Sequence, residues 1–346
     1  MSVMVLDAGN SIIKAKIARR ENGEISFPHA MKQLTESEYE KITNRAGFQN
    51  QSIDFMRING KPYVVGESAE RHGLITQRTG TARYTRDYYG VLAAAALGRL
   101  YDRSREMSVF GSHPPGDIQF RQDLMEAVVG KWDVEIKGTE RHFRVSNANT
   151  FDEPVGGLMN VLLTEDGQHY QHTEIKDGRA LVIDIGGFMT DWLAVNPGGE
   201  IDYSLARSIP IGIQIVLTDF EQSFRSNNLN SVKDTPVLPP DRVRKALLTG
   251  VFEGGGKKYP CEQEVEEATS LMLNRIADTY QRLAGGALSW DNIILTGGGS
   301  ALLHHKLVPI LKHNNVILAD AKENLHLANV RGGLKLWRLY EMLEIV

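Results

Sequence analysis

Two short stretches of the sequence repeat one pattern of residues that could bind phosphate and metal. In each, an apolar run ends in an aspartate, a glycine-containing turn follows, and a second apolar run begins; they are residues 3–17 and 180–195. A shift of 177 positions, the difference between 184 and 7, places Asp7 on Asp184 and Gly9 on Gly186. The chain therefore contains an internal repeat of a hairpin with an aspartate at the end of its first strand.

The chemistry that suits this pattern is the binding of a polyphosphate with Mg²⁺. Glycine lets backbone N–H groups approach an anion closely, and a carboxylate can hold hydrated Mg²⁺. Asn10, Ser11 and Thr190 could add hydrogen-bond donors, and Lys14 could add a positive charge. The alternative is that each copy is an ordinary hairpin with a favourable turn. That alternative would suit one copy, but two aligned copies favour a binding function.

A third candidate element lies at residues 292–303, where a short apolar strand runs into Gly297, Gly298 and Gly299 and then into a predicted helix. Bare backbone at a helix N-terminus would let a flat nucleoside lie against it. The same pattern also serves as an ordinary strand-to-helix turn, so by itself it is weak evidence. It gains weight as the third such element in one chain.

Glu153 stands at the start of a predicted helix, just before Pro154, which suits a first helical turn. Gly156 and Gly157 would let that helix pack closely against a neighbour. One interpretation is a capped connecting helix. The other places Glu153 beside a γ-phosphate, where it would orient or activate a water molecule.

Composition bounds the remaining possibilities. The 346 residues leave room for two domains, and 42% hydrophobic with 24% charged residues is ordinary for a globular protein. A net charge of −4 does not favour direct binding of nucleic acid. The sequence shows no apolar run of about 20 residues and no charged leader, and Cys261 is its one cysteine. We expect a cytoplasmic protein that does not bind membranes.

Local patterns predict further elements around these motifs. We expect a three-strand meander over residues 3–27, a polar irregular segment at 35–51 and a hairpin around Asn59-Gly60. The basic segment 67–86 is predicted to be a solvated loop or a surface that contacts another subunit. A long amphipathic helix is predicted at 262–283, with an inner face formed by Val265, Ala268, Leu271, Met272, Ile276 and Tyr280.

The order of the motifs resembles the actin-like ATPases, the superfamily of actin, sugar kinases and heat-shock chaperones. Residues 7–14 and 184–191 match its two phosphate motifs, 295–302 its adenosine motif, and 153–157 its linking helix. Within the superfamily the chain is most similar to the ParM/StbA group, which comprises plasmid-segregation actins and their archaeal and phage relatives. The residues that carry this similarity are Asp7-Ala8-Gly9-Asn10-Ser11 and Ser112-His113-Pro114-Pro115-Gly116.

The resemblance implies an α/β actin-like ATPase fold, with two ribonuclease-H-like domains and a nucleotide cleft between them. Domain I would span residues 1–163 and be closed by a C-terminal helix at 327–346. Domain II would span 164–326.

The resemblance also implies a role for each motif residue. Asp7 and Asp184 would position Mg²⁺, and Glu153 would be the catalytic acid that activates water. The β- and γ-phosphates would be contacted by Gly9, Asn10, Ser11 and Lys14 from one side and by Gly186, Gly187, Phe188 and Thr190 from the other. Gly297, Gly298 and Gly299 would lie beside the adenosine. Phe188 departs from the family pattern, in which many relatives have a small hydroxyl residue.

The implied activity is Mg²⁺-dependent hydrolysis of ATP, or of GTP, coupled to assembly of head-to-tail filaments. Such filaments would position plasmid or phage DNA through a DNA-binding adaptor protein. One alternative is a non-polymerising ATPase or kinase of the same fold, which would need an additional base for its substrate. Another is a nucleotide-gated interaction module with little turnover.

Overall fold

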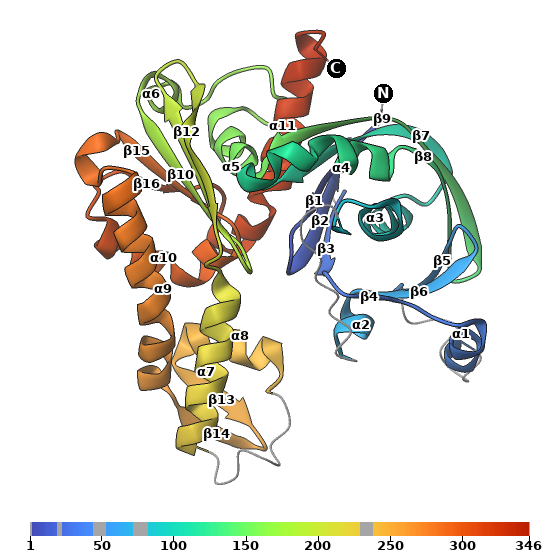
Figure 1. Cartoon of the computed structure of the whole chain (residues 1–346), viewed down its shortest axis with the longest axis horizontal. Coiled ribbons are helices and arrows are strands. Elements are labelled where there is room, and N and C mark those ends of the chain that lie inside the picture. Colours follow the sequence, from blue (N-terminus) through green and yellow to red (C-terminus); the bar gives the residue numbers. More distant parts are fainter. Residues whose placement is uncertain (1, 19–22, 44–52, 72–81, 229–237, 346) are drawn as a thin grey trace. The chain divides into compact units, whose positions relative to one another are not determined.

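The computed structural model describes residues 2–18, 23–43, 53–71, 82–228 and 238–345. The chain divides into two compact units. Unit 1 comprises Met1–Thr173 and Leu327–Val346, and unit 2 comprises Glu174–His326. Figure 1 shows the elements of both units.

Within the described ranges, unit 1 has a nine-stranded sheet in the order β3-β2-β1-β7-β9-β8-β5-β6-β4. β1, β2 and β3 form the predicted antiparallel meander, and β7 and β9 continue it in parallel with β1. The strands are β1 (Val3–Ala8), β2 (Ile12–Ile17), β3 (Glu24–Pro28), β4 (Met31–Gln33), β5 (Phe55–Ile58), β6 (Lys61–Val65), β7 (Arg105–His113), β8 (Gly130–Ile136) and β9 (Thr139–Asp152).

The part of unit 1 that the structure describes also contains several helices. They are α1 (Glu36–Thr43), α2 (Glu67–Arg71), a π-helical turn η3 (Arg86–Gly90), α3 (Val91–Leu100), a 3₁₀ helix η4 (Pro115–Phe120), α4 (Arg121–Val128), α5 (Glu153–Leu162) and α11 (Ala328–Met342). A short helix, α6 (Thr173–Asp177), begins at the last residue of the first segment of unit 1 and belongs otherwise to unit 2.

The prediction of an irregular segment at 35–51 is wrong for α1. Thr35 and Glu38 form a reciprocal capping box, in which the Glu38 amide donates to Thr35 Oγ1 and the Thr35 amide donates to Glu38 Oε2. This pairing starts the helix despite its polar sequence. The rest of that segment, 44–51, lies outside the described residues.

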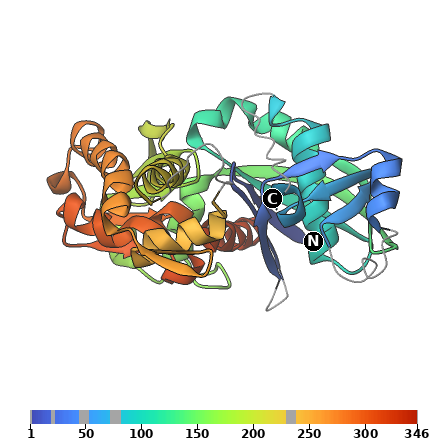
Figure 2. The same cartoon turned by 90° about the horizontal axis from the view of Figure 1, so that it is seen from below.

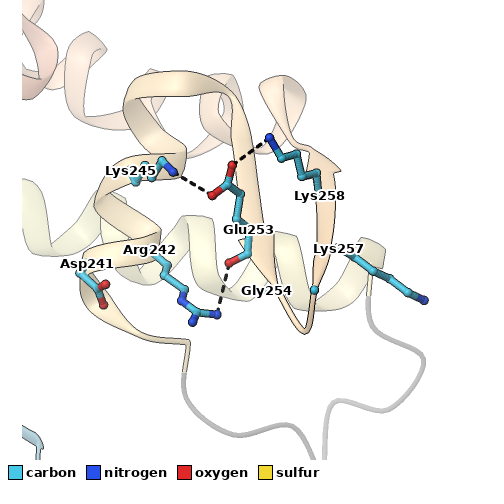
Figure 3. Close-up of a pocket in the computed structure, with 8 residues that line it drawn as sticks. Asp241, Arg242, Lys245, Glu253, Gly254, Lys257 and Lys258 are labelled. Atoms are coloured by element: carbon cyan, nitrogen blue, oxygen red, sulfur yellow. Dashed lines mark hydrogen bonds and ion pairs between the residues drawn. The ribbon is translucent and has the colours of Figure 1, made fainter.

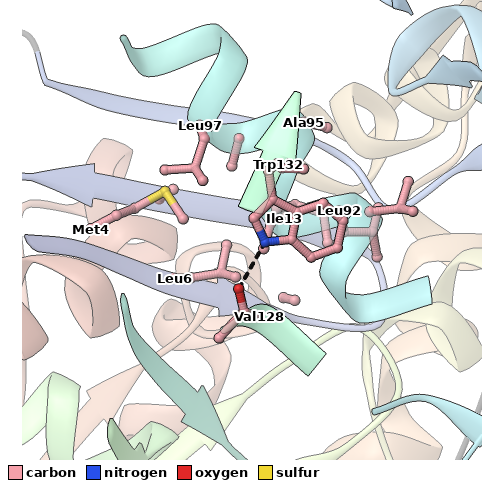
Figure 4. Close-up of a cluster of buried hydrophobic side chains, with 14 of the residues drawn as sticks. Met4, Leu6, Ile13, Leu92, Ala95, Leu97, Val128 and Trp132 are labelled. Atoms are coloured by element: carbon pink, nitrogen blue, oxygen red, sulfur yellow. Dashed lines mark hydrogen bonds between the residues drawn. The ribbon is translucent and has the colours of Figure 1, made fainter. Parts of the chain in front are cut away.

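The sheet of unit 1 bends around α3, which contacts β1, β2, β3, β5 and β8 (Figure 1). α3 is buried along almost its whole length. Its small alanine side chains let strands approach it closely from several sides. Figure 4 shows part of this core, where the Trp132 indole Nε1 donates to the Val128 carbonyl at 2.8 Å. The indole is thus buried with its polar group satisfied.

The C-terminal helix α11 packs against α5. Gly156 of α5 and Gly332 of α11 meet backbone to backbone: a Cβ on Gly332 would overlap the Gly156 carbonyl, and one on Gly156 would overlap Asn329. The predicted close packing of the α5 glycines is therefore confirmed for Gly156. Lys335 Nζ adds a hydrogen bond to the Asn160 carbonyl at 2.9 Å.

Unit 2 has a five-stranded sheet, and the part of it that the structure describes repeats the first half of the unit 1 sheet. Its order is β12-β11-β10-β15-β16, with an antiparallel meander followed by two parallel strands, as in β3-β2-β1-β7-β9. The strands are β10 (Ala180–Ile185), β11 (Thr190–Asn196), β12 (Glu200–Ile209), β15 (Asn292–Thr296), β16 (Val316–Leu318) and a separate hairpin of β13 (Val251–Gly254) and β14 (Lys257–Pro260).

In unit 2, α9 packs against α7 and α10 (Figures 1 and 2). The helices are α7 (Ile213–Asn228), α8 (Pro240–Thr249), α9 (Glu262–Leu283), α10 (Gly298–Leu311) and the 3₁₀ helices η5 (Ala287–Ser289) and η6 (Lys322–Leu327). α9 has the predicted bounds. Leu271 was wrongly assigned to its inner face, since that side chain is 46% exposed. No helix in the described ranges combines the length and apolar character needed to cross a bilayer.

Candidate functional site

The first phosphate motif lies in the turn between β1 and β2. Asp7 is fully buried on β1, and Gly9, Asn10 and Ser11 are partly exposed in the turn. A Cβ on Gly9 would lie 3.1 Å from the Ile12 carbonyl and 3.3 Å from Asp7 Oδ1. A side chain at position 9 would therefore crowd the space beside the carboxylate.

Asp7 is paired with Lys14, its register partner on β2. Lys14 Nζ lies 2.7 Å from Asp7 Oδ2. The other oxygen, Oδ1, is buried and has no hydrogen-bond partner among the described residues. An oxygen donor of this kind fits the water shell of Mg²⁺. Lys14, predicted to contact phosphate, is thus placed where its charge also neutralises Asp7.

The carboxyl ends of the parallel strands bring other groups of unit 1 to the same sheet edge. β1 pairs with β7 and β7 with β9, whose last residue, Asp152, precedes Glu153 at the start of α5. Burial raises the pKa of Tyr89, the charge of Arg83 opposes this, and the charges of Asp7 and Glu153 raise it further. Both carboxylates thus act electrostatically on one buried hydroxyl, and the fold gathers them in one region.

Three carbonyls of the turn after β1 are held by residues that the motif analysis did not select. Arg83 Nη2 donates to the Ala8 carbonyl, His29 Nδ1 to the Gly9 carbonyl, and the His29 amide to the Ser11 carbonyl. The prediction of a solvated loop at 67–86 is wrong for Arg83, which is 3% exposed. Residues 72–81 of that segment lie outside the described residues. No local sequence signal marks His29, since its partner is 20 positions away.

The second phosphate motif lies between β10 and β11. Asp184 and Asp191 are both buried and stand opposite each other in the hairpin register, so they occupy the same sheet face. Two carboxylates so placed supply the oxygen donors that Mg²⁺ prefers. Asp191 was not a predicted site residue, although its register with Asp184 follows from the turn length.

The turn after β10 is closed by backbone hydrogen bonds. The Gly186 amide donates to the Met189 carbonyl at 2.9 Å. The first two amides of α7, those of Ile213 and Gln214, donate to the carbonyls of Gly186 and Gly187 at 3.1 and 2.8 Å. The N-terminus of α7 therefore fixes both glycine peptides.

Thr190 and Phe188 flank this turn in different ways. The Thr190 hydroxyl is buried and donates to the Ile211 carbonyl at 2.6 Å, which commits its one proton. The predicted use of this hydroxyl as a phosphate donor is therefore not favoured by this geometry. Phe188 is partly exposed, and only its backbone could act as a donor.

The third motif packs directly on the second. Thr296 at the end of β15 is in register with Asp184, and Gly297 follows with φ +86°. A Cβ on Gly297 would overlap Asp184 Oδ1, and one on Gly299 would overlap Ile185. Gly298 begins α10. Unit 2 thus gathers Asp184, the turn glycines and the start of α10 at one sheet edge.

A separate pocket of about 450 Å³ lies in unit 2 between α8 and the β13–β14 hairpin (Figure 3). Lys245 and Lys258 both point toward Glu253, at 2.8 and 3.3 Å from its carboxylate oxygens. Gly255 and Gly256, both with positive φ, form the tip of the β13–β14 hairpin there. None of the predicted site residues lines this pocket.

The two sheets share one order of five strands, and each places an aspartate and a glycine turn at the same point. This repeat defines the class of α/β protein to which the chain belongs. Two family models match it: "Actin like proteins N terminal domain" over residues 6–156 and "Archaeal actin homologue MreB-like, C-terminal" over 182–309. The chain belongs to the actin-like protein family. No curated protein matches it in sequence.

Solved structures show the same fold. The subunit of a 15-stranded ParM filament from Clostridium botulinum superposes with a TM-score of 0.76 at 19% identity, covering 97% of this chain and 98% of that one. The archaeal actin homologue Ta0583 superposes with a TM-score of 0.74 at 19% identity, covering 97% and 99%. Its complex with ADP gives 0.71 at 18% identity with the same coverage. The predicted actin-like α/β fold is therefore confirmed.

Proposed function

We propose that the protein binds and hydrolyses ATP with Mg²⁺ and assembles into filaments in a nucleotide-dependent manner. The observation that carries this proposal is the duplicated sheet edge, in which each copy places a buried aspartate beside a glycine turn. Support also comes from the fold, which is shared with a filament-forming ParM and with an archaeal actin homologue crystallised with ADP.

In this proposal the two turns contact the phosphates of a single nucleotide. Gly9, Asn10 and Ser11 would contribute amides from unit 1, and Gly186 and Gly187 would contribute amides from unit 2. The start of α10, at Gly297–Gly299, would lie beside the nucleoside. Mg²⁺ would be held by Asp7 and Asp184, largely through water, and would neutralise charge on the phosphates.

Glu153 would orient the attacking water and accept its proton. It is partly buried at the first position of α5. The Glu153→Gln variant should bind ATP with near-wild-type affinity but hydrolyse it about a hundredfold more slowly or worse, since a positioned base contributes roughly that much. Wild-type turnover in this variant would refute the role of Glu153.

Light scattering and pelleting after addition of nucleotide test the assembly directly. Scattering should rise with ATP and Mg²⁺ and fall as ATP is consumed. Parallel samples with GTP, with ADP, and with ATP plus a chelator establish which nucleotide and metal are required. Hydrolysis without any sedimentable polymer would instead support a non-polymerising ATPase.

The stoichiometry of binding tests whether the two turns serve one nucleotide. Titration calorimetry with a non-hydrolysed ATP analogue should give one nucleotide per chain. Two independent sites per chain would overturn the shared site.

The cellular role that we propose is the positioning of plasmid or phage DNA through a DNA-binding adaptor. A net charge of −4 favours an adaptor over direct contact with DNA. Purified filaments should leave bare DNA unbound at physiological salt, and an electrophoretic shift of bare DNA at that salt would contradict the adaptor model.

A further inference from the structure

The turn after β1 is anchored by buried side chains that lie outside all the phosphate motifs. The Ala8 carbonyl accepts a hydrogen bond from Arg83 Nη2 at 2.6 Å, and the Gly9 carbonyl accepts one from His29 Nδ1 at 2.6 Å. The His29 amide adds a third bond, to the Ser11 carbonyl at 2.9 Å. Arg83 and His29 are each 3% exposed, so these bonds are shielded from water.

The hydrogen-bond partners fix the protonation state of His29. A carbonyl oxygen can only accept, so Nδ1 must carry the proton that is donated to Gly9. Burial is the largest cause of a lowered pKa for His29, about 4, so the ring is neutral at pH 7. Nε2 is then an acceptor, and the Tyr88 hydroxyl, 2.7 Å away and fully buried, donates to it. Tyr88, His29 and Gly9 thus form one chain of hydrogen bonds, in which Tyr88 donates to His29 and His29 donates to Gly9.

This arrangement sets the direction of the turn's amides. In a trans peptide the C=O of one residue and the N–H of the next point in opposite directions. Fixing the Ala8 and Gly9 carbonyls toward Arg83 and His29 therefore aims the amides of Gly9 and Asn10 away from those side chains. Successive amides that point the same way form the kind of concave site that binds anions.

We propose that His29 and Arg83 are positioning residues for phosphate binding, with Tyr88 orienting His29. They hold the peptides of the turn so that N–H groups, rather than carbonyl oxygens, face the nucleotide. A carbonyl turned toward a phosphate would repel it, so a turn free to rotate its peptides would bind phosphate more weakly. This inference rests on the proposed nucleotide-binding function and assigns residues that none of the three motifs contains.

The test compares the affinity of adenosine, ADP and ATP, each with Mg²⁺, for wild-type protein and variants. His29→Ala and Arg83→Met should weaken ADP and ATP binding by about tenfold or more while leaving adenosine binding within about twofold, since only phosphates meet the turn. His29→Asn should recover most of the loss, because its side-chain amide can occupy the place of Nδ1 and donate to Gly9. Tyr88→Phe should have a smaller effect, of about threefold.

Trp132→Phe is the matched control. It removes another buried hydrogen bond from a side chain to the backbone of unit 1, the one to Val128, which is not part of the turn. It should lower thermal stability without changing the ratio of ADP to adenosine affinity. If His29→Ala does not fold, His29→Asn, Arg83→Met and Arg83→Lys carry the test, with Arg83→Lys expected to retain more ADP affinity than Arg83→Met.

The outcomes separate this inference from the proposed function. Wild-type protein that binds no adenine nucleotide would refute the proposed function itself. Wild-type binding together with unchanged ADP affinity in both His29→Ala and Arg83→Met would overturn the positioning role alone. An equal loss for adenosine and ADP would also overturn it, since that result marks a general structural effect.

Discussion

The turn after β1 and the turn after β10 occupy equivalent places in the five-strand arrangement that the two sheets share, yet different groups hold them in place. In unit 1 the turn carbonyls accept hydrogen bonds from the side chains of Arg83 and His29 and from the His29 amide. In unit 2 they accept from the first amides of α7, those of Ile213 and Gln214. The same turn is thus fixed by distant side chains in one unit and by a helix N-terminus in the other.

The residue opposite each aspartate also differs. Lys14 pairs with Asp7 at 2.7 Å, whereas the position equivalent to Lys14 in unit 2 is Asp191, opposite Asp184. Unit 1 therefore carries a charge-neutralised carboxylate and unit 2 a pair of carboxylates. The two copies thus share the backbone turn and the first aspartate but differ in the residue that stands opposite it.

The largest expected effect comes from removing the unit 2 carboxylate. Asp184→Asn should lower kcat for ATP hydrolysis by about a hundredfold or more, the usual scale for losing one preorganised electrostatic group. Asp7→Asn should cause a loss of similar size if both turns serve one nucleotide. Steady-state ATPase assays across a range of Mg²⁺ concentrations measure both, and wild-type turnover in either variant would show that the two copies are not functional equivalents.

Replacing a glycine in each unit by alanine tests how closely the backbone is packed at the two sites. Gly297→Ala should cost about 4 kcal/mol, because alanine is strained at φ +86° and its Cβ would overlap Asp184. Gly9→Ala should cost about 1 kcal/mol, because its Cβ would lie no closer than 3.1 Å to a neighbour. Hydrogen exchange measured by mass spectrometry reports each unit separately. Equal destabilisation by the two substitutions would contradict this difference.

The ion pair between Lys14 and Asp7 in unit 1 should contribute measurably to the stability of that unit. Lys14→Met leaves Asp7 buried without its charged partner and should cost about 3 kcal/mol, at the lower end for breaking a buried pair because Lys14 is 13% exposed. Urea unfolding monitored through unit 1 tests this. Lys32→Met is the control, since the pair of Lys32 with Glu38 is exposed to solvent and its loss should change stability much less. Adding Asp7→Asn to Lys14→Met should restore part of the lost free energy of unfolding. If nothing is restored, an unpaired charge on Asp7 is not the cause of the loss.

The smallest effect concerns the closing helix, which also belongs to unit 1 alone. A hydrogen bond from Arg331 is the largest cause of the lowered pKa of Glu24, about 2 instead of 4.5. The folded state thus binds fewer protons than the unfolded state between these values. The stabilisation is fully present above about pH 4.5 and is lost as pH falls toward 2.

Glu24→Gln should therefore lower stability at pH 7 by about 1 kcal/mol, and its thermal midpoint should converge with that of the wild type as pH falls to about 2. Glu200→Gln is the control in unit 2, because that side chain is exposed near the start of the corresponding strand, β12. A difference between Glu24→Gln and wild type that persists unchanged to pH 2 would rule out this ion pair as its source.

Much of the candidate site could be predicted because it depends on local pattern. Apolar runs interrupted by a glycine turn define β1–β2 and β10–β11 within a few residues, and comparing the two stretches reveals the repeat. The bounds of α9 follow from its periodicity and acidic start. These features need only neighbouring residues, whose interactions are fixed by chain geometry.

Other features could not be predicted because their partners are distant in the sequence. Arg83 lies 75 positions from Ala8 and reads as part of a basic loop, yet the fold buries it against the first turn. Leu271 fits the helical stripe of α9 but is exposed, since only packing decides where a stripe ends. The Thr35–Glu38 capping box was readable in the sequence and was missed because the segment is so polar.

The sequence by itself determined the duplicated strand–turn–strand units, the aspartates that end their first strands and the glycines that leave backbone amides accessible. Those properties follow from side-chain periodicity and from the absence of a Cβ. Only the tertiary structure decided which groups hold each turn and whether each aspartate is met by a lysine or a second carboxylate. Buried hydrogen bonds and ion pairs depend on which side chains the packed sheet brings within about 3 Å, and such distances do not follow from separation along the chain.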